Sequence, residues 1–90
     1  MTKKIAVLIR DRQAEALRMS VGLILLDDSV ELFVLDSELE RTESNMDYIE
    51  LAKEMDINIY SNNRANKELQ YMPLDEIALK LTEYDHILAY

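Results

Sequence analysis

The chain of 90 residues contains no cysteine and no tryptophan, and it has one glycine and one proline. Without cysteine it can form no disulfide, no thiolate metal site and no cysteine nucleophile. A single glycine rules out the Gly-rich phosphate-binding loops of both common kinds. These absences exclude several large classes of enzyme before any secondary structure is considered.

Positive charge is also scarce, because 10 Lys and Arg face 18 Asp and Glu and leave a formal charge of −8. Such a chain is repelled by phosphate backbones and by anionic lipid surfaces. The longest apolar runs, residues 5–9 and 23–26, are too short to span a bilayer or to form a signal peptide. We therefore expect a soluble cytoplasmic protein that binds neither nucleic acid nor a membrane.

What is present is typical of one folded domain covering residues 1–90, with 49% hydrophobic and 31% charged residues. Apolar runs rich in β-branched residues alternate with segments of helical spacing. The predicted strands are residues 3–9, 30–35, 57–60 and 86–90. The predicted helices are residues 12–26, residues 46–55, a short helix within the polar segment 61–69, and a helix opened by Pro73 with Leu74, Ile77, Ala78 and Leu81 on its buried face.

The alternation of strands and helices predicts a three-layer α/β/α fold, in which helices cover both faces of a parallel sheet. The segment 3–9 is a continuous apolar run, and a strand buried on both faces belongs in the middle of a sheet. We therefore expect four strands in the order 3-2-1-4, with the last strand beside the first.

Ligands of such sheets bind beyond the carboxyl ends of the strands. Ser61 to Arg64 could hold a small anion with backbone N–H groups at a helix start and a guanidinium, or could simply cap that helix. The turn after the first strand could line the same crevice, or could be a solvated turn with Asp11 as helix cap. The candidate pocket residues are Arg10, Asp11, Arg12, Ser61, Asn62, Asn63 and Arg64.

Other chemistry finds little support in the sequence. Asp11, Asp36 and Glu38 have side chains suited to a hard cation, but they lie on different predicted loops without motif spacing. We therefore predict no metal and no other cofactor. The single histidine, His86, begins the last strand and lies at the edge opposite the crevice, so no Ser–His pair forms there. We predict no catalytic residue.

The run Leu23-Ile24-Leu25-Leu26 covers every side of a helical turn, which one sheet face cannot bury completely. Leu23, Leu25 and Leu26 are therefore candidate interface residues. The alternative is that neighbouring elements of the same chain cover them.

The segments KKIAVLIRD, EALRMSVGLILLDDSVELFVLD and LTEYDHILAY resemble the DsrE/DsrF/DsrH-like family of sulfur-relay proteins over nearly the whole chain. The resemblance implies a parallel three-layer α/β fold, association with DsrE/F-like subunits and, in active members, persulfide transfer through a cysteine. That cysteine would lie in the stretch IYSNNRANKEL, where this chain has Ser61, Asn62 and Asn63. A hydroxyl or an amide cannot carry a persulfide, so the family's chemistry is not expected here.

Two hypotheses for function follow. The first is a non-catalytic DsrE/F-like protein, a structural, regulatory or small-ligand-binding subunit of a homo- or hetero-oligomer with a possible link to sulfur metabolism. The second is an enzyme that acts on a small anionic substrate through Ser61, Arg64, Arg10 and Asp11. The missing cysteine and the position of His86 favour the first.

Overall fold

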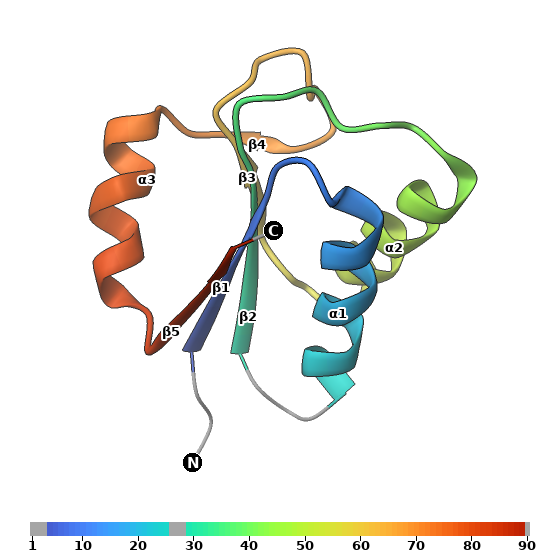
Figure 1. Ribbon diagram of the computed structural model, residues 1–90, viewed down its shortest axis with the longest axis horizontal. Helices are drawn as coiled ribbons and strands as arrows, with labels where there is room; N and C mark the ends of the chain where they lie inside the picture. Colours follow the sequence, from blue (N-terminus) through green and yellow to red (C-terminus); the bar gives the residue numbers. More distant parts are fainter. Residues whose placement is uncertain (1–3, 26–28, 90) are drawn as a thin grey trace.

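The computed structural model describes residues 4–25 and 29–89, arranged as shown in Figure 1. The strands are β1 (Lys4–Ile9), β2 (Ser29–Val34), β3 (Ile59–Ser61), β4 (Gln70–Tyr71) and β5 (His86–Ala89). The helices are α1 (Gln13–Leu25), α2 (Glu43–Glu54), α3 (Leu74–Lys80) and the 3-10 turn η1 (Leu81–Glu83).

The sheet has five strands in the order β4-β3-β2-β1-β5, and each pairs in parallel with its neighbours. The predicted α/β class with a parallel sheet is confirmed, and β3, β2, β1 and β5 have the predicted neighbours. The predicted number of strands is wrong, because β4 adds a strand beyond β3. β4 is only two residues long and both are exposed, so the sequence carries no apolar pattern that marks it.

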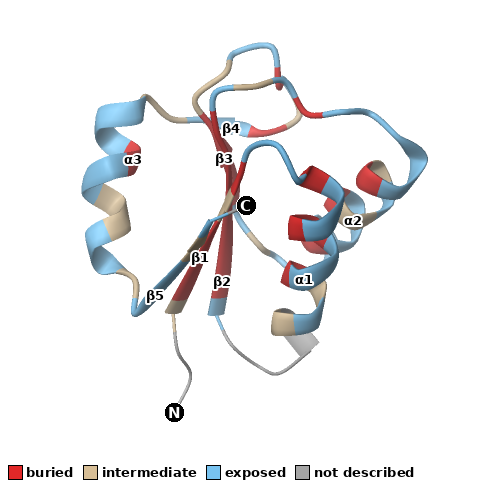
Figure 2. Ribbon diagram, viewed as in Figure 1, coloured by how far each residue is buried: buried red, intermediate tan, exposed pale blue. Residues whose placement is uncertain are grey.

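The core has two parts, one on each face of the sheet (Figure 2). On one face, Val7 and Ile9 pack with buried residues of α1 and α2, including Leu17 and Ile49. On the other face a smaller cluster gathers around Phe33 beneath α3. Figure 1 shows α1 and α2 on one side of the sheet and α3 on the other. β1 and β2 are therefore covered on both faces, as their apolar sequences require.

Helix α2 begins three residues earlier than the predicted segment 46–55. Thr42 is its N-cap, and the Thr42 hydroxyl accepts a hydrogen bond from the Asn45 backbone N–H at 3.2 Å. Such a side-chain bond satisfies one of the free N–H groups at a helix start. Among the described residues, no helix is long and apolar enough to cross a membrane.

Helix α3 follows Pro73 as expected, but most of its predicted buried face is not buried. Ile77 is buried and Leu81 is half-buried, whereas Leu74 is 55% exposed and Ala78 is exposed. The physical reason is that, within residues 4–25 and 29–89, no other α-helix lies over this face of the sheet to cover the flanks of α3 (Figure 1).

The short helix predicted within residues 61–69 is also absent, and two turns occupy this segment before β4. Asparagine side chains bond the backbone of the loop and of its neighbours, which stabilises turns in competition with a helix. The predicted anion site therefore has no helix start at this loop.

Candidate functional site

The loops that follow β1, β2 and β3 meet at the carboxyl edge of the sheet, where the sequence places the candidate pocket. Arg10, Asp11 and Arg12 are all exposed in the turn between β1 and α1. Arg12 lies 3.7 Å from Glu15, and its carbonyl accepts the Ala16 N–H at 2.9 Å. Within residues 4–25 and 29–89, the Arg10 guanidinium and the Asp11 carboxylate have no hydrogen bond or ion pair.

Gln13, which the sequence analysis did not single out, joins the first two of these loops. Its amide nitrogen donates to the carbonyls of Arg10, at 3.3 Å, and Glu38, at 3.2 Å. Its amide oxygen accepts the Glu40 N–H at 2.7 Å. Gln13 is buried, so this side chain replaces water as the partner of the loop backbone.

Ser61 and Asn66 lock the second and third loops together. Ser61 is fully buried, and its hydroxyl accepts a hydrogen bond from the Asn66 side-chain nitrogen at 2.9 Å and from the Asn63 N–H at 3.1 Å. Asn66 is also buried, and its side-chain oxygen accepts the Leu39 N–H at 2.8 Å. The Ser61 hydroxyl is thus part of an internal network beneath the surface.

A second amide bridge joins the same two loops. The Asn62 side-chain oxygen accepts the Asp36 N–H at 2.8 Å, and its nitrogen donates to the Asp36 carboxylate at 3.1 Å. Asp36 has a φ of 67°, a left-handed conformation that residues other than glycine adopt mainly when they are Asn or Asp. The pair of hydrogen bonds helps to hold this conformation.

Arg64, the cation of the predicted anion site, stacks on an aromatic ring. Its guanidinium carbon lies 4.0 Å from the centre of the Tyr71 ring, a cation–π arrangement. Both residues are exposed. Ser61, Asn62, Asn63 and Arg64 therefore lie together at the end of β3 and in the loop after it. Ser61 and Asn63 are hydrogen-bonded within this segment, and Asn62 is hydrogen-bonded to Asp36 of the loop after β2.

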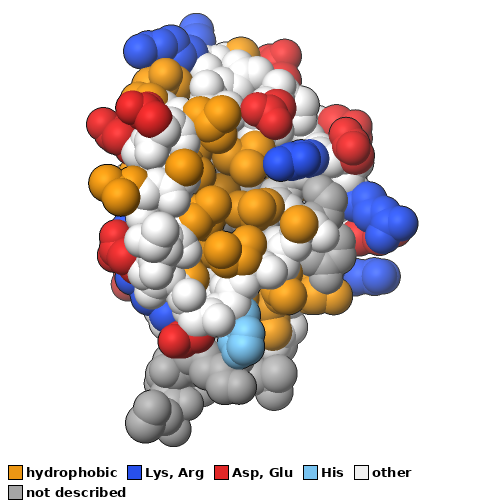
Figure 3. All heavy atoms as spheres, turned by 60° about the vertical axis from the view of Figure 1, so that its left-hand side comes forward, with side chains coloured by type: hydrophobic (Ala, Val, Ile, Leu, Met, Phe, Trp, Pro, Cys, Tyr) orange, Lys and Arg blue, Asp and Glu red, His pale blue; other side chains and the backbone are white. Residues whose placement is uncertain are grey.

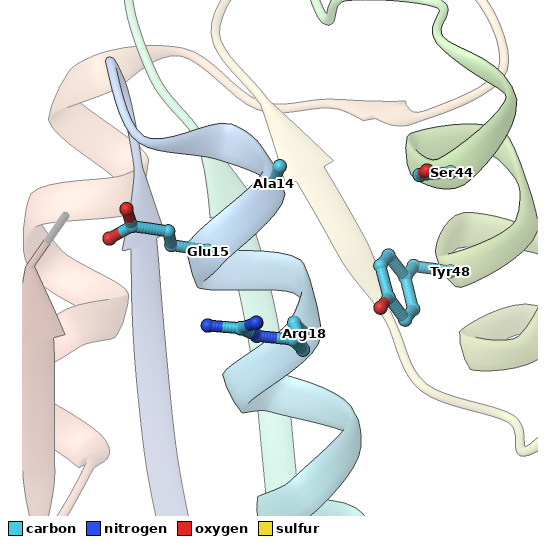
Figure 4. Close-up of a pocket in the computed structure, with 5 residues that line it drawn as sticks. All are labelled: Ala14, Glu15, Arg18, Ser44 and Tyr48. Atoms are coloured by element: carbon cyan, nitrogen blue, oxygen red, sulfur yellow. The ribbon is translucent and has the colours of Figure 1, made fainter.

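A pocket of about 300 Å³ lies between the first turns of α1 and α2, beside this edge (Figure 4). In Figure 4 the Tyr48 ring points from α2 toward α1, whereas the charged ends of Glu15 and Arg18 extend away from it. The pocket thus places no charged group opposite the tyrosine. Its lining residues are Ala14, Glu15, Arg18, Ser44 and Tyr48.

No group of three or more His, Asp or Glu side chains in the described part of the chain is arranged to hold a metal ion. His86 is exposed at the start of β5, at the end of the sheet away from Ser61.

Glu31 is the centre of a polar cluster on the α3 side of the sheet that the sequence analysis missed. Its carboxylate accepts hydrogen bonds from the hydroxyls of Tyr84 and Tyr60 and from the Asn58 side chain, the last at 2.8 Å. The Lys80 ammonium lies 3.7 Å away. A lone Glu in the run VELFV gives no sign of these partners, which come from β3 and the residue before it, from α3 and from the segment before β5.

The electrostatics of this cluster keep the carboxylate charged. Burial acts to raise the pKa of Glu31, but the hydrogen bonds and the charge of Lys80 outweigh it, so the pKa lies below its usual value. Burial raises the pKa of Tyr84, and its bond to the Glu31 carboxylate raises it further. The pKa of Tyr60 is raised by burial and by the Glu31 charge. The cluster therefore consists of a carboxylate anion, neutral tyrosine and asparagine donors and the Lys80 cation, which suits it to fixing α3 and η1 on the sheet.

The predicted interface at the end of α1 is described only in part. Leu23 is half-buried and packs against the main core. Leu26 and the side chain of Leu25 lie outside the described residues.

A different apolar surface is exposed beside α3 (Figure 3). Hydrophobic side chains gather across the middle of the face that Figure 3 brings forward, and charged side chains surround them. The exposed fractions are 47% for Ile87 on β5 and 73% for Leu79 on the outer side of α3.

Comparisons of this chain with models of known protein families, with curated proteins and with solved structures find no match. The resemblance to the DsrE/DsrF/DsrH-like family therefore stays a prediction.

Proposed function

We propose that this protein is a non-catalytic subunit that acts by binding another protein chain, in a structural or regulatory role. The observation that carries the proposal is the contrast between two edges of the fold. At the carboxyl edge, the side chains of Ser61, Asn62 and Asn66 are engaged in internal hydrogen bonds, whereas strand β5 lies exposed beside apolar side chains. Exposed apolar surface of this kind is typical of interaction sites.

The hydrogen bonds of the carboxyl edge argue against a small ligand at Ser61. A ligand that reached this hydroxyl would have to break its bonds with Asn66 and Asn63, and the Asn66 amide would lose a buried partner. A buried polar group that loses its partner costs more free energy than a typical hydrogen bond contributes.

The alternative is an enzyme acting on a small anionic substrate through Ser61, Arg64, Arg10 and Asp11. The free charges of Arg10 and Asp11 favour it to a limited degree, since nothing in the described chain neutralises them. The buried Ser61 hydroxyl has no general base among its hydrogen-bond partners, which are amide groups. Non-catalytic binding therefore agrees better with the buried Ser61 hydroxyl and the exposed β5 edge than the enzyme does.

The kind of partner is inferred from the resemblance to the DsrE/DsrF/DsrH-like family. If the chain is a DsrE/F-like protein, its partners are further copies of itself or other DsrE/F-like subunits, and a role in sulfur metabolism follows. Without a cysteine, such a role is assembly or regulation rather than sulfur transfer.

A thermal-shift panel separates the two functions. The purified chain is heated with sulfite, thiosulfate, phosphate or nucleotides, each matched to sodium chloride at the same ionic strength. A ligand that binds only the folded state raises its melting temperature, so the assay detects binding. We expect no anion to raise the melting temperature beyond the salt control. Stabilisation by one anion that is lost in Arg64→Ala, but kept in the exposed control Lys67→Ala, would contradict the proposal and favour the enzyme.

A further inference from the structure

Strand β5 is the last strand at one end of the sheet, and its outer edge has no strand beside it among the described residues. An edge strand presents backbone N–H and C=O groups that can pair with another chain. His86, Ile87 and Ala89 are exposed, and Leu88 is half-buried. No proline interrupts the strand and no charged side chain blunts it.

Apolar side chains lie beside this edge on the α3 side of the sheet. The register pairs Ile87 with Ala6 and Ala89 with Leu8, so Ile87, Ala89 and Leu8 share the face of the sheet that α3 covers. Figure 3 shows hydrophobic side chains filling the space between α3 and this edge. We name the β5 strip the residues Leu8, Leu81, Ile87 and Ala89, which lie on the α3 side of the sheet and are exposed or half-buried.

We propose that the β5 strip binds a second copy of this chain, with the two β5 strands antiparallel and Ile87 facing Ile87 across a twofold axis. This inference rests on the proposed function, since it names the partner of a chain that acts by binding. The two sheets then form one continuous sheet, and both copies place α3 on the same face. Cyclic dimers with one self-complementary patch are the commonest soluble oligomers.

The antiparallel pairing of the two β5 strands follows from the face of the sheet on which each β5 side chain lies. A twofold axis perpendicular to the sheet keeps each face on its own side, so residues opposite each other must point the same way. Placing Ile87 opposite its own symmetry mate meets this condition. It also puts Ala89 of one copy opposite Asp85 of the other, and it joins the two β5 strips.

The charges at the two ends of the β5 strip are opposite in sign, which supports a second copy of this chain as the binding partner. Beyond the carboxyl end of β1 and β5 lie the exposed cations Arg10 and Arg12, with one carboxylate, Asp11, between them. Before the amino end of β5 lie the exposed carboxylates Glu83 and Asp85. Antiparallel pairing brings the basic end of each copy to the acidic end of the other, twice in one dimer.

The other charged residues near the two ends of β5 do not cancel the basic end or the acidic end. At the acidic end, Lys4 lies 3.7 Å from Glu83, and the Asp85 carboxylate accepts the Lys4 backbone N–H at 2.8 Å. At the basic end, Glu15 lies 3.7 Å from Arg12, so Arg10 is the cation with no ion pair in the described chain. Arg10 is therefore the side chain best placed to bind the partner's acidic end.

Sedimentation of the full chain tests the interface. We expect a dimer at high micromolar concentration, and we expect Ile87→Asp to yield folded monomers because it places two carboxylates opposite each other on the axis. Leu79→Asp is the matched control, since Leu79 is 73% exposed on α3 but outside the β5 strip. Far-ultraviolet circular dichroism checks that both variants are folded.

A charge-reversal pair tests the complementarity. Arg10→Glu and Lys67→Glu change the net charge equally, and Lys67 is exposed in the loop before β4. Arg10→Glu should weaken the dimer by about tenfold, whereas Lys67→Glu should leave its dissociation constant nearly unchanged.

The absence of cysteine allows a direct test of whether Ile87 lies opposite its own symmetry mate. Ile87→Cys introduces one thiol per chain, and two thiols can be oxidised to a disulfide only if their Cα atoms lie within about 7 Å. With copper phenanthroline as the oxidant, we expect rapid covalent dimers from Ile87→Cys and not from Leu79→Cys.

The outcomes separate this inference from the proposed function. A monomer at high concentration, a dimer that Ile87→Asp leaves intact, or equal crosslinking of the two cysteine variants overturns the inference alone. The proposed function falls only if the anion panel gives the Arg64-dependent stabilisation described above. A folded monomer that binds a different protein through β5 also overturns the second-copy assignment and leaves the proposed function standing.

Discussion

The Tyr84 hydroxyl donates a hydrogen bond to the Glu31 carboxylate, although 53 positions separate the two residues in the chain. Tyr84 lies between η1 and β5, and Glu31 lies on the central strand β2. Tyr84 also packs its ring edge-to-face against Phe33, with the ring centres 5.9 Å apart. The pair therefore fixes the segment that leads into β5 on the sheet.

Glu31→Gln should destabilise the protein at neutral pH while preserving the shape of the side chain. The amide removes the charge that Tyr84, Tyr60 and Lys80 face, and it adds a donor where three donors already converge. We expect a loss of about 1–3 kcal/mol in the free energy of unfolding, measured by urea denaturation. The exposed control Glu50→Gln makes the same charge change and should stay near the parent value. Equal losses in both variants would contradict the structural role of Glu31.

The same cluster predicts how stability changes with pH. Because the pKa of Glu31 is lower in the folded state than its ordinary value of 4.5, its contribution is present above that value and is lost as pH falls through the folded pKa. The pKa values of Tyr60 and Tyr84 are raised, so their contributions are present below their ordinary value of 10.0 and are lost as pH rises above it.

Urea denaturation across pH measures this dependence. The difference in unfolding free energy between the parent and Glu31→Gln should be constant near neutrality and should shrink on the acid side. A difference that grows as pH falls below the ordinary value of the carboxyl would show that the sign of the Glu31 shift is wrong.

Asn66→Ala should destabilise the loops at the carboxyl edge. The substitution leaves the buried Leu39 N–H without its partner at 2.8 Å and removes the donor to Ser61. An unsatisfied buried group costs about 1–3 kcal/mol, whereas an exposed substitution such as Lys67→Ala should stay within about 0.5 kcal/mol of the parent. Amide hydrogen exchange at Leu39 gives an independent measurement, since this N–H should lose protection. Unchanged protection there would argue against the Asn66 bond.

The sequence predicts the order of the four longer strands because buried strands have a recognisable hydrophobic pattern. The continuous apolar run of β1 indicates an interior strand, and the sheet order places β1 between β2 and β5. β4 could not be predicted in this way, because Gln70 and Tyr71 are both exposed and the strand is defined only by pairing with β3. This pairing depends on the path of the loop between β3 and β4, which no local sequence pattern predicts.

The side-chain bridges could not be predicted for a related reason. Polar residues at Ser61 and Asn62 indicate a loop, but the same residues suit helix capping, anion binding or internal hydrogen bonds. The structure selects internal bonds, because Asp36 and Asn66 lie within reach of them. Glu31 was missed since its partners lie 27 to 53 positions away in the chain.

Ser61 stands at the position where the family resemblance would place a reactive cysteine. Because Ser61 is fully buried and its hydroxyl accepts bonds from Asn66 and Asn63, Ser61→Cys should place the new thiol beneath the loop rather than at the surface. A buried thiol away from cations has a raised pKa and little thiolate, and the thiolate is the form that attacks sulfur. Arg64 cannot activate it from its present position, since its guanidinium stacks on Tyr71 at 4.0 Å.

The measurement is the rate at which Ellman's reagent and a persulfide donor modify Ser61→Cys, with Lys67→Cys as the exposed control and the cysteine-free parent as the blank. We expect Lys67→Cys to react at the rate of an ordinary accessible thiol, Ser61→Cys to react only when urea unfolds it, and the parent to gain no sulfur by intact mass. A folded Ser61→Cys that accepts one dithiothreitol-reversible sulfur faster than Lys67→Cys would show an activated, accessible position. That result would favour sulfur-relay ancestry for this loop over the closed network that the hydrogen bonds indicate.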